Sequence, residues 1–450
     1  MTGRYKAYSE YKEYNSAWFD FLPSHWQSVS LKWTSHLYSG GTPSKDNLSF
    51  WENGSIPWLN SGAVNQSLIE KPSAFITRDA FNNSSAKWIP KQSLVMALAG
   101  QGKTKGMVAQ LAIDSTCNQS MAAIVPSKDI SSRFLFWWLT SNYQKIRNMA
   151  GGDLRDGLNL ELLGSISSPI FDRKEQQKIA NFLDHETAKI DTLIAKQEKL
   201  IELIQEKRQA VISNAVTKGL NPDVPMKDSG VEWLGEVPEH WDRSRLGFEC
   251  SVKARLGWKG LKADEYVPEG YIFLATPNIK GSDIDFENVN YITKQRYDES
   301  PEIMLQENDL LVTKDGSTTG TTNLVRSLPE PATVNSSIAV IRSRGNIHPE
   351  YLYYFFVSTY TQNVIKRMQG GMGVPHLFQA DLRWFHILLP SNIEQKSIAK
   401  YLDIQTAKCD LIIKKATNAI QLMKERKTAL ILAAVTGKID VRDWRPKGIQ

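Results

Sequence analysis

Two long stretches of the chain place apolar residues at helical spacing. Residues 173–217 contain no proline, and apolar positions recur every three or four residues, the pattern of a helix with one buried stripe. The stretch at 391–440 has the same pattern. A stripe of this length needs a partner to cover it, so we expect two long antiparallel helices, one at 171–219 and one within 391–440, that pack on each other. The residues expected at their contact are Leu183, Ile190, Leu193, Ile194, Leu200, Ile201, Leu402, Ile412, Ile413, Ile420 and Met423.

The rest of the chain alternates short apolar runs with turn signals. Runs at 56–59, 94–98, 310–312 and 338–341 predict strands, and aromatic-rich segments at 132–149 and 349–368 predict helices. We therefore predict an α+β protein in which two long helices separate two mixed α/β domains. The expected division is an N-terminal segment with the first domain at 1–170, a spacer helix at 171–219, a second domain at 220–390, and a second spacer helix with the C-terminal segment at 391–440.

The chain also repeats itself at long range. Residues 175–184 return at 394–403, a shift of 219 positions. Shorter echoes keep the same order: 18–26 with 233–241, 102–106 with 316–320, 118–120 with 335–337, and 134–138 with 351–355. Such an internal pseudo-twofold repeat presents two similar surfaces, which suits two half-sites on duplex DNA because the duplex has the same approximate symmetry.

Each repeated helix is expected to begin with a capping box. Asp172 stands three residues before Glu175, and Ser391 stands three residues before Glu394. In a capping box the first side chain bonds the backbone of the third helical residue, whose own side chain reaches back. We therefore expect both glutamates to serve their own helix starts.

Composition narrows the class of protein. The formal charge of +6 over 450 residues permits nucleic-acid binding without requiring it. The three cysteines, Cys117, Cys250 and Cys409, lie far apart, which argues against a disulfide framework and a cysteine-rich zinc site. No apolar run approaches the roughly 20 residues that span a bilayer. We expect a cytoplasmic protein with no membrane partner.

Basic and hydroxyl side chains in turns are the candidate DNA contacts. Arginine can read guanine with two hydrogen bonds, whereas lysine more often neutralises a phosphate. One group lies in a glycine-rich turn, a second in its repeat, a third around Gly257, and a fourth after a predicted strand. These candidates are Gln101, Lys103, Thr104 and Lys105; Lys314, Ser317 and Thr318; Lys253, Arg255, Lys259 and Lys262; and Arg342 and Arg344.

No catalytic constellation is evident in the sequence. The Gly-Lys-Thr at 102–104 resembles the end of a phosphate loop, but Ala97 stands where the first glycine is required. His25 and His240 hold the same place in the two copies, and we expect packing or capping roles for them. Methyltransferase, metalloprotease and serine-hydrolase motifs are all missing, so the chain is expected to recognise a ligand without catalysing a reaction.

These repeated residues resemble the specificity subunits of type I restriction-modification systems. The likeness is carried by 229–241, by the two Glu-Gln-x-x-Ile-Ala helix starts at 175–180 and 394–399, and by the Ala-Val-Thr endings at 215–217 and 434–436. Gly-Gly-Thr-Pro-Ser at 40–44 is similar to the start of a target-recognition domain in that family. The N-terminal copy departs from the pattern because 18–26 lacks the Ser-Gly-Val-Glu start found at 229–232.

The resemblance implies a division of labour. Each variable domain would read one half of an asymmetric, bipartite site on double-stranded DNA, and the helices would set the gap between the halves. Two modification subunits would bring S-adenosylmethionine and flip an adenine for methylation. Restriction subunits, which translocate and cleave with ATP and Mg²⁺, would join them. No cofactor would be bound by the chain itself.

Two alternatives remain open from the sequence. The chain could serve a related system in which one partner chain carries both methylation and cleavage. It could instead be a two-headed adaptor that does not bind DNA, although the divergence of the two domains beside nearly identical helices disfavours that interpretation. A steep loss of affinity with rising salt would favour DNA recognition.

Overall fold

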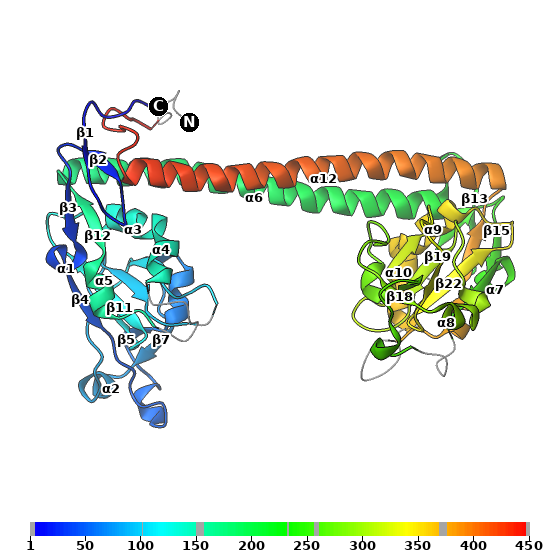
Figure 1. Ribbon diagram of the computed structural model, residues 1–450, viewed down its shortest axis with the longest axis horizontal. Coiled ribbons are helices and arrows are strands. Elements are labelled where there is room, and N and C mark those ends of the chain that lie inside the picture. Colours follow the sequence, from blue (N-terminus) through cyan, green and yellow to red (C-terminus); the bar gives the residue numbers. More distant parts are fainter. Residues whose placement is uncertain are drawn as a thin grey trace. The chain divides into compact units, whose positions relative to one another are not determined.

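The computed structural model describes residues 5–100, 102–149, 157–231, 234–255, 261–368 and 376–446. The chain forms two compact units (Figure 1). Unit 1 comprises Met1–Gln197 and Asn418–Gln450, and unit 2 comprises Glu198–Thr417. The two long helices, α6 (Arg173–Lys218) and α12 (Asn392–Val435), each contribute one part to unit 1 and the other part to unit 2.

Unit 1 is a mixed α/β domain. Its strands are β1 (Tyr11–Glu13), β2 (Phe21–Pro23), β3 (Gln27–Ser30), β4 (Ser35–Ser39), β5 (Ile56–Leu59), β6 (Leu68–Ile69), β7 (Ala74–Ile76), β8 (Leu94–Ala97), β9 (Val108–Leu111), β10 (Thr116–Cys117), β11 (Met121–Pro126) and β12 (Ser167–Ile170). Its short helices are α1 (Leu31–Thr34), α2 (Arg78–Asn82), α3 (Ser132–Ser141), α4 (Tyr143–Asn148) and α5 (Leu160–Ser165), with 3-10 turns at Leu48–Phe50 and Ser61–Asn65. The larger sheet has the order β4-β11-β8-β9-β6, and a smaller one has the order β10-β5-β7.

Unit 2 contains a second domain of the same kind. Its strands are β13 (Met226–Asp228), β14 (Glu236–Pro238), β15 (Asp242–Arg245), β16 (Cys250–Lys253), β17 (Tyr271–Leu274), β18 (Asn290–Ile292), β19 (Leu310–Thr313), β20 (Thr322–Leu324), β21 (Ala332–Val334), β22 (Ile338–Ser343) and β23 (His386–Leu389). Its short helices are α7 (Leu246–Glu249), α8 (Lys294–Asp298), α9 (Pro349–Val357), α10 (Thr359–Met368) and α11 (Gln379–Arg383), with 3-10 turns at Ala263–Glu265, Thr276–Asn278 and Pro301–Ile303.

The two units share one topology. The order β16-β22-β19-β20 in unit 2 repeats β4-β11-β8-β9 in unit 1, and β18-β17-β21 repeats β7-β5-β10. In each small sheet the central strand pairs parallel with one neighbour and antiparallel with the other. The sequence repeat thus extends to the sheets, where the side chains have diverged. The predicted α+β class with two mixed domains and two long helices is confirmed.

The predicted strands and helices agree with the observed ones, with one difference. Each aromatic-rich segment forms two helices instead of one, α3 with α4 and α9 with α10. In the first segment the helix is interrupted at Asn142, whose side-chain amide donates to the carbonyl of Trp138 at 3.0 Å. In the second segment the helix is interrupted at Ser358, whose hydroxyl accepts from the backbone N–H of Thr361 at 3.2 Å. Such local side-chain bonds compete with the helical ladder and end it.

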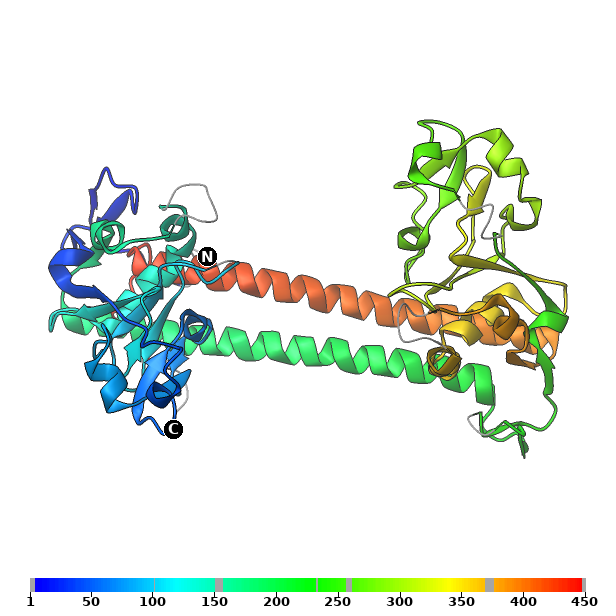
Figure 2. The same ribbon diagram turned by 90° about the horizontal axis from the view of Figure 1, so that it is seen from below.

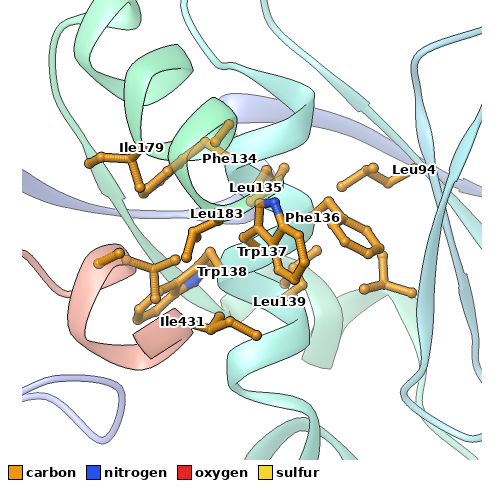
Figure 3. Packing of buried hydrophobic residues seen from close by; sticks show 14 of the residues in the cluster. Leu94, Phe134, Leu135, Phe136, Trp137, Trp138, Leu139, Ile179, Leu183 and Ile431 are labelled. Atoms are coloured by element: carbon orange, nitrogen blue, oxygen red, sulfur yellow. The ribbon is translucent and has the colours of Figure 1, made fainter. Parts of the chain in front are cut away.

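A core of aromatic residues joins each domain to the helices beside it. In unit 1, α3 presents Phe134 and Trp138 to Ile179 and Leu183 of α6 and to Ile431 of α12, and these residues belong to one buried cluster (Figure 3). In unit 2, α9 supplies the equivalent aromatic run beside α6 and α12 residues. Burying such large side chains is the main stabilising contribution that either attachment can make.

The two long helices run antiparallel inside each unit, where they lie side by side in both views (Figures 1 and 2). In unit 1, Lys427 of α12 forms an ion pair of 2.7 Å with Asp191 of α6. In unit 2, Nε of Arg208 on α6 lies 3.4 Å from the carboxylate of Asp410 on α12.

The predicted contact residues on the helices were partly correct. Buried residues include Leu183, Ile190, Leu402 and Ile420, whereas Ile194 and Met423 pack partly against the unit 1 core. Half-exposed positions include Ile201 and Ile413. The prediction was wrong for Leu193, Leu200 and Ile412, which are 48%, 38% and 40% exposed. A pair of helices buries only the narrow seam between them, so neighbouring positions of a broad apolar stripe stay in solvent.

Candidate nucleic-acid interface

Three loops meet at one end of the strands of the large sheet in unit 1. Strand β8 ends at Ala97, which pairs with Met121 at the start of β11, and Ser39 at the end of β4 pairs with Ala122. The loops after β4, after β8 and before β11 therefore emerge together. A hydrogen bond of 2.8 Å from the backbone of Leu98 to the carbonyl of Ser120 joins two of them.

Unit 2 builds the same edge from its own residues. The loops after β16, after β19 and before β22 emerge together, because Lys253 and Thr313 end strands whose partner β22 begins at Ile338. The backbone N–H of Lys314 donates to the carbonyl of Ser337 at 2.7 Å, as Leu98 does to Ser120. We call this set of loops, which lies at one end of the strands, the loop edge of each unit.

The glycine-rich turn of the loop edge has the same backbone in both units. Gly102 and Gly316 both have φ of +85°, and Gly106 and Gly320 have φ of +84° and +90°. These values suit glycine, since a Cβ disfavours the left-handed region. Each turn closes with a 2.8 Å bond from its second glycine back to the preceding strand, at Ala97 or Thr313. The predicted echo of 102–106 in 316–320 is confirmed as a shared turn.

The second repeated turn, which we call the asparagine turn, comprises 118–120 in unit 1 and 335–337 in unit 2, and it also carries polar side chains to the loop edge. Backbone N–H groups of Asn118 and Asn335 each donate at 2.9 Å to the end of the neighbouring sheet, at Leu59 and Leu274. In unit 1, this turn lines a cavity of about 520 Å³ together with the loop after β4. Its lining residues are Thr42, Lys45, Leu48, Trp51, Trp58, Asn60, Asn118, Gln119 and Ser120.

The sequence pattern does not reveal this cavity, although both of its parts carry a signal. Asn118–Ser120 is one of the repeated segments, and Thr42 belongs to the glycine-rich segment at 40–44. The hydroxyl of Thr42 is hydrogen-bonded to the side-chain oxygen of Gln119, which joins the two loops across 77 positions of sequence. Only folding shows that they line one cavity.

Several predicted DNA-contact residues lie exposed on the loop edges. Lys103 is exposed in unit 1, where its carbonyl accepts a bond of 2.6 Å from the hydroxyl of Tyr143. Thr104 is half-buried beside it. In unit 2 the exposed candidates are Lys253, Lys262, Ser317 and Thr318. Arg344 is exposed as well, but it follows β22 and therefore lies at the opposite end of the sheet. Contact with DNA by these residues stays a prediction.

Other candidates are buried, which contradicts the expected surface position. Lys105 and Lys314 are 4% and 8% exposed. Burial lowers the pKa of Lys314, against the opposing charge of Asp315. A buried ammonium is a poor phosphate ligand because its stem and charge are already enclosed by protein. Gln101 and Lys259 lie outside the described residues.

Arg255 is a second correction. The residue is 3% exposed, and its guanidinium donates to the carbonyl of Val334 at 3.2 Å and to the hydroxyls of Ser300 and Thr333, both at 3.3 Å. Burial, followed by the charge of Arg296, lowers the pKa of Arg255. The side chain therefore ties the start of the loop after β16 to the small sheet, and does not project toward a ligand.

Arg342 is likewise engaged within the protein. Two of its nitrogens donate to the two carboxylate oxygens of Asp309 at 2.6 and 2.7 Å, and one also donates to the carbonyl of Met304 at 2.9 Å. The hydrogen bond to Asp309 raises the pKa of Arg342. Asp309 is fully buried, so this two-pronged pair has a structural role.

The repeated helix starts position each domain. The side chain of Gln176 accepts from the backbone of Ser131, the N-cap of α3, at 2.8 Å, and Gln395 accepts from His348, the N-cap of α9, at 2.7 Å. Eight residues further along each helix, Asp184 accepts from the indole of Trp137 at 2.9 Å, and Asp403 accepts from the hydroxyl of Tyr354 at 2.7 Å. The repeated motif thus holds an aromatic helix, and with it the loop edge, to the long helix.

The described ranges lack two further features, a membrane-spanning helix and a metal-binding group. Within them, no helix combines the length and apolarity needed to cross a membrane. The same ranges contain no group of three His, Cys, Asp or Glu side chains placed to hold a metal ion.

Comparison with known proteins places these features in a family. The profile described as "Type I restriction modification DNA specificity domain" matches residues 23–203 and 239–422. The chain is 27% identical over 232 residues to the EcoR124I/EcoR124II specificity subunit of Escherichia coli, covering 51% of this chain and about half (52%) of that relative. It is 22% identical over 438 residues to the EcoKI specificity subunit of Escherichia coli K12, covering 94% of this chain and 91% of that one.

Two solved structures share the fold. One, titled as the structural basis of complex assembly and conformational transition of the type I R-M system, aligns with a TM-score of 0.69 at 16% identity, covering 93% of this chain and 99% of its own. The crystal structure of the HsdS subunit from Thermoanaerobacter tengcongensis aligns with a TM-score of 0.55 at 15% identity, covering 93% and 98%.

Proposed function

The chain belongs to the type I restriction-modification DNA specificity family, and from that premise we propose that it reads an asymmetric DNA site in two parts, one part with each unit. Its relatives are specificity subunits, so its task is DNA recognition, while catalysis belongs to other chains of the complex.

The observation that carries the proposal is the repeated loop edge. Both units present a glycine turn and an asparagine turn on the same strand ends, with the same backbone bonds. The side chains differ: Lys103 and Thr104 in one turn correspond to Ser317 and Thr318 in the other. A common backbone with different hydrogen-bonding groups is what two readers of different base sequences require.

Helices α6 and α12 are proposed to set the gap between the two half-sites. Asp191 and Arg208 are 17 positions apart on α6, and their partners Lys427 and Asp410 are 17 positions apart on α12. A single antiparallel register therefore accounts for the pairs found inside both units. A helical stretch of 17 residues rises about 25 Å, so a change in helix length would change the distance between the readers.

The partners are proposed to be double-stranded DNA, two modification subunits and the restriction subunits. The repeated attachment of domain to helix gives the chain two similar sides, which favours two copies of the methylating partner. We place S-adenosylmethionine on the modification subunits and ATP with Mg²⁺ on the restriction subunits, with no cofactor on this chain. The turn at 102–104 supports this, because its counterpart at 316–318 has no lysine.

A methylation map tests the proposal. Genomic DNA would be sequenced for methylated adenine in cells that express the chain with its modification subunit, and in matched cells that lack the chain. We expect a new two-part motif that disappears with the chain. Unchanged methylation, with the modification subunit shown to be present and assembled, would contradict the proposal.

A further inference from the structure

The most exposed aromatic side chain of each unit, among the described residues, occupies the same place in the repeat. Trp33 in unit 1 is 75% exposed and Phe248 in unit 2 is 66% exposed. Each is the third residue of a four-residue helix, α1 or α7, whose first residue, Leu31 or Leu246, is fully buried. The helix is therefore held by its leucine while its aromatic residue faces solvent.

A cation lies beside each of these aromatic residues, although different helices supply it. In unit 1, Lys32 of α1 packs against Gly164 of α5, where an added Cβ would lie 3.2 Å from the Cβ of Lys32. In unit 2 the glycine lies on the first helix and the cation on the second. Gly247 of α7 packs against Arg383 of α11, and a Cβ added at Gly247 would lie 3.0 Å from the Cβ of Arg383. Packing alone would not need a charged residue at this contact. Both units thus place one cation and one glycine at this contact, and in unit 2 the guanidinium of Arg383 also donates to the carbonyl of Val252 at 3.4 Å.

The surroundings of the two aromatic residues are basic. Nζ of Lys32 lies 5.4 Å from the ring of Trp33. Phe248 and Arg383 line a cavity of about 270 Å³ with Arg245 and Trp384, and the guanidinium of Arg245 lies 4.3 Å from the ring of Trp384. Among the described residues, none of the ion pairs includes Lys32, Arg245 or Arg383. Carboxylates from another molecule would complement this charge.

These positions lie away from the loop edges. Helix α1 leads into Ser35 of β4, which pairs with Pro126 at the end of β11, whereas the loop edge lies at the start of β11. Helix α7 leads into Cys250 of β16, which pairs with Ser343 at the end of β22. Each exposed aromatic residue is thus at the opposite end of its sheet from the turns proposed to read DNA.

We propose that Trp33 with Lys32, and Phe248 with Arg383, are the centres of two equivalent protein-docking patches that receive two copies of one partner chain. The contacting segment of that partner would place an apolar side chain on the aromatic ring and carboxylates beside the cation. Exposed aromatic and arginine residues at a patch centre are the usual anchors of protein interfaces. This inference rests on the proposed function in one respect, since the modification subunit is the partner expected in two copies.

The test is the stoichiometry of the complex. The full chain would be co-purified with its modification subunit, and native mass spectrometry would count bound copies for wild type, Trp33→Ser, Phe248→Ser and the double variant. We expect two firmly held copies on wild type, one firmly held copy on each single variant with the other bound about thirtyfold more weakly, and both copies bound about thirtyfold more weakly on the double variant. Phe75→Ser, which removes a 47% exposed aromatic residue elsewhere in unit 1, should keep two copies.

A swap of the cation separates docking from folding. Lys32→Gly should weaken one copy, and adding Gly164→Lys should restore it, because unit 2 already supplies its cation from the second helix. Circular dichroism would show that each variant is folded. Two firmly held copies on the folded Trp33→Ser/Phe248→Ser variant would overturn the patches and leave the proposed function standing. A wild-type chain that binds no modification subunit would overturn the partner assignment in both proposals.

Discussion

The indole N–H of Trp241 donates a hydrogen bond of 3.0 Å to the carboxylate of Glu394, the third residue of α12. Trp26 and Glu175 form the same bond at 3.2 Å on α6. Nε2 of His240 lies 3.0 Å from Glu394, and Nε2 of His25 lies 3.1 Å from Glu175. Each glutamate therefore holds the segment that precedes its domain, and each histidine is exposed and pairs with the same glutamate instead of packing in the core.

Removing this acceptor should loosen unit 2. Glu394→Ala leaves the indole of Trp241 without its partner, and bonds to charged groups contribute about 1.5–3 kcal/mol each, so we expect a destabilisation of about 2–3 kcal/mol. Urea unfolding would measure it, and hydrogen exchange at 236–245 would locate it. Lys396→Ala, on the exposed side of the same turn, is the control and should change little. Equal stability of the two variants would contradict the role given to Glu394.

Arg342 should behave as a structural residue. Arg342→Ala leaves the fully buried Asp309 without its cation, and breaking a buried pair costs about 3–5 kcal/mol. The thermal midpoint should fall, and recognition by unit 2 should fall with it. Arg344 lies two residues away and is exposed, so the free energy of unfolding of Arg344→Ala should stay within about 0.5 kcal/mol of wild type. A stable Arg342→Ala protein with weaker DNA binding would return Arg342 to the candidate DNA contacts.

Single lysines on the loop edges should affect one half-site each. Lys103→Ala should weaken binding to one half of the site, and Lys253→Ala should weaken binding to the other, each by removing a phosphate contact. The slope of log affinity against log salt should become shallower by about 1 for each. Binding would be measured on DNA in which one half-site at a time is scrambled. Equal losses at both halves from one variant would argue against one reader per unit.

The gap between the two half-sites of the DNA should lengthen when both long helices are lengthened. Inserting about one turn, four residues, into α6 and α12 at matched positions keeps the pairs Asp191–Lys427 and Arg208–Asp410 in one register. We expect methylated sites with a longer gap. An insertion in α6 alone should shift these pairs out of register and reduce activity. An active double insertion with an unchanged gap would refute the spacer role.

Two cysteines should be unreactive in the folded protein. Burial raises the pKa of Cys117 and of Cys250 to about 12, so the thiolate needed for alkylation is scarce at neutral pH. Iodoacetamide at pH 8 should label both only after urea is added, as read by mass spectrometry. Rapid labelling of either under native conditions would show that its part of the core opens easily.

Much of the architecture followed from periodicity and repetition. A 3.6-residue period extends through 173–217, and continuous apolar runs at 94–97 and 338–341 mark strands that the structure buries on both sides. These patterns act through short-range geometry, so sequence alone determined that the chain has two mixed domains and two long helices. The repeat also located the glycine turns, because Gly102 and Gly316 need a backbone that few other residues adopt.

Tertiary structure decided what the side chains of those elements do. Glu175 fits a capping box, and Asp172 does cap the helix backbone at 3.2 Å, but the carboxylate of Glu175 turns to Trp26, 149 residues away. Arg255 and Arg342 carry the charge expected of DNA contacts, but burial and long-range partners such as Asp309 occupy them. Local pattern sets an element and its faces, whereas the use of a charge depends on which distant residues fold against it, and only the packed chain brings those together.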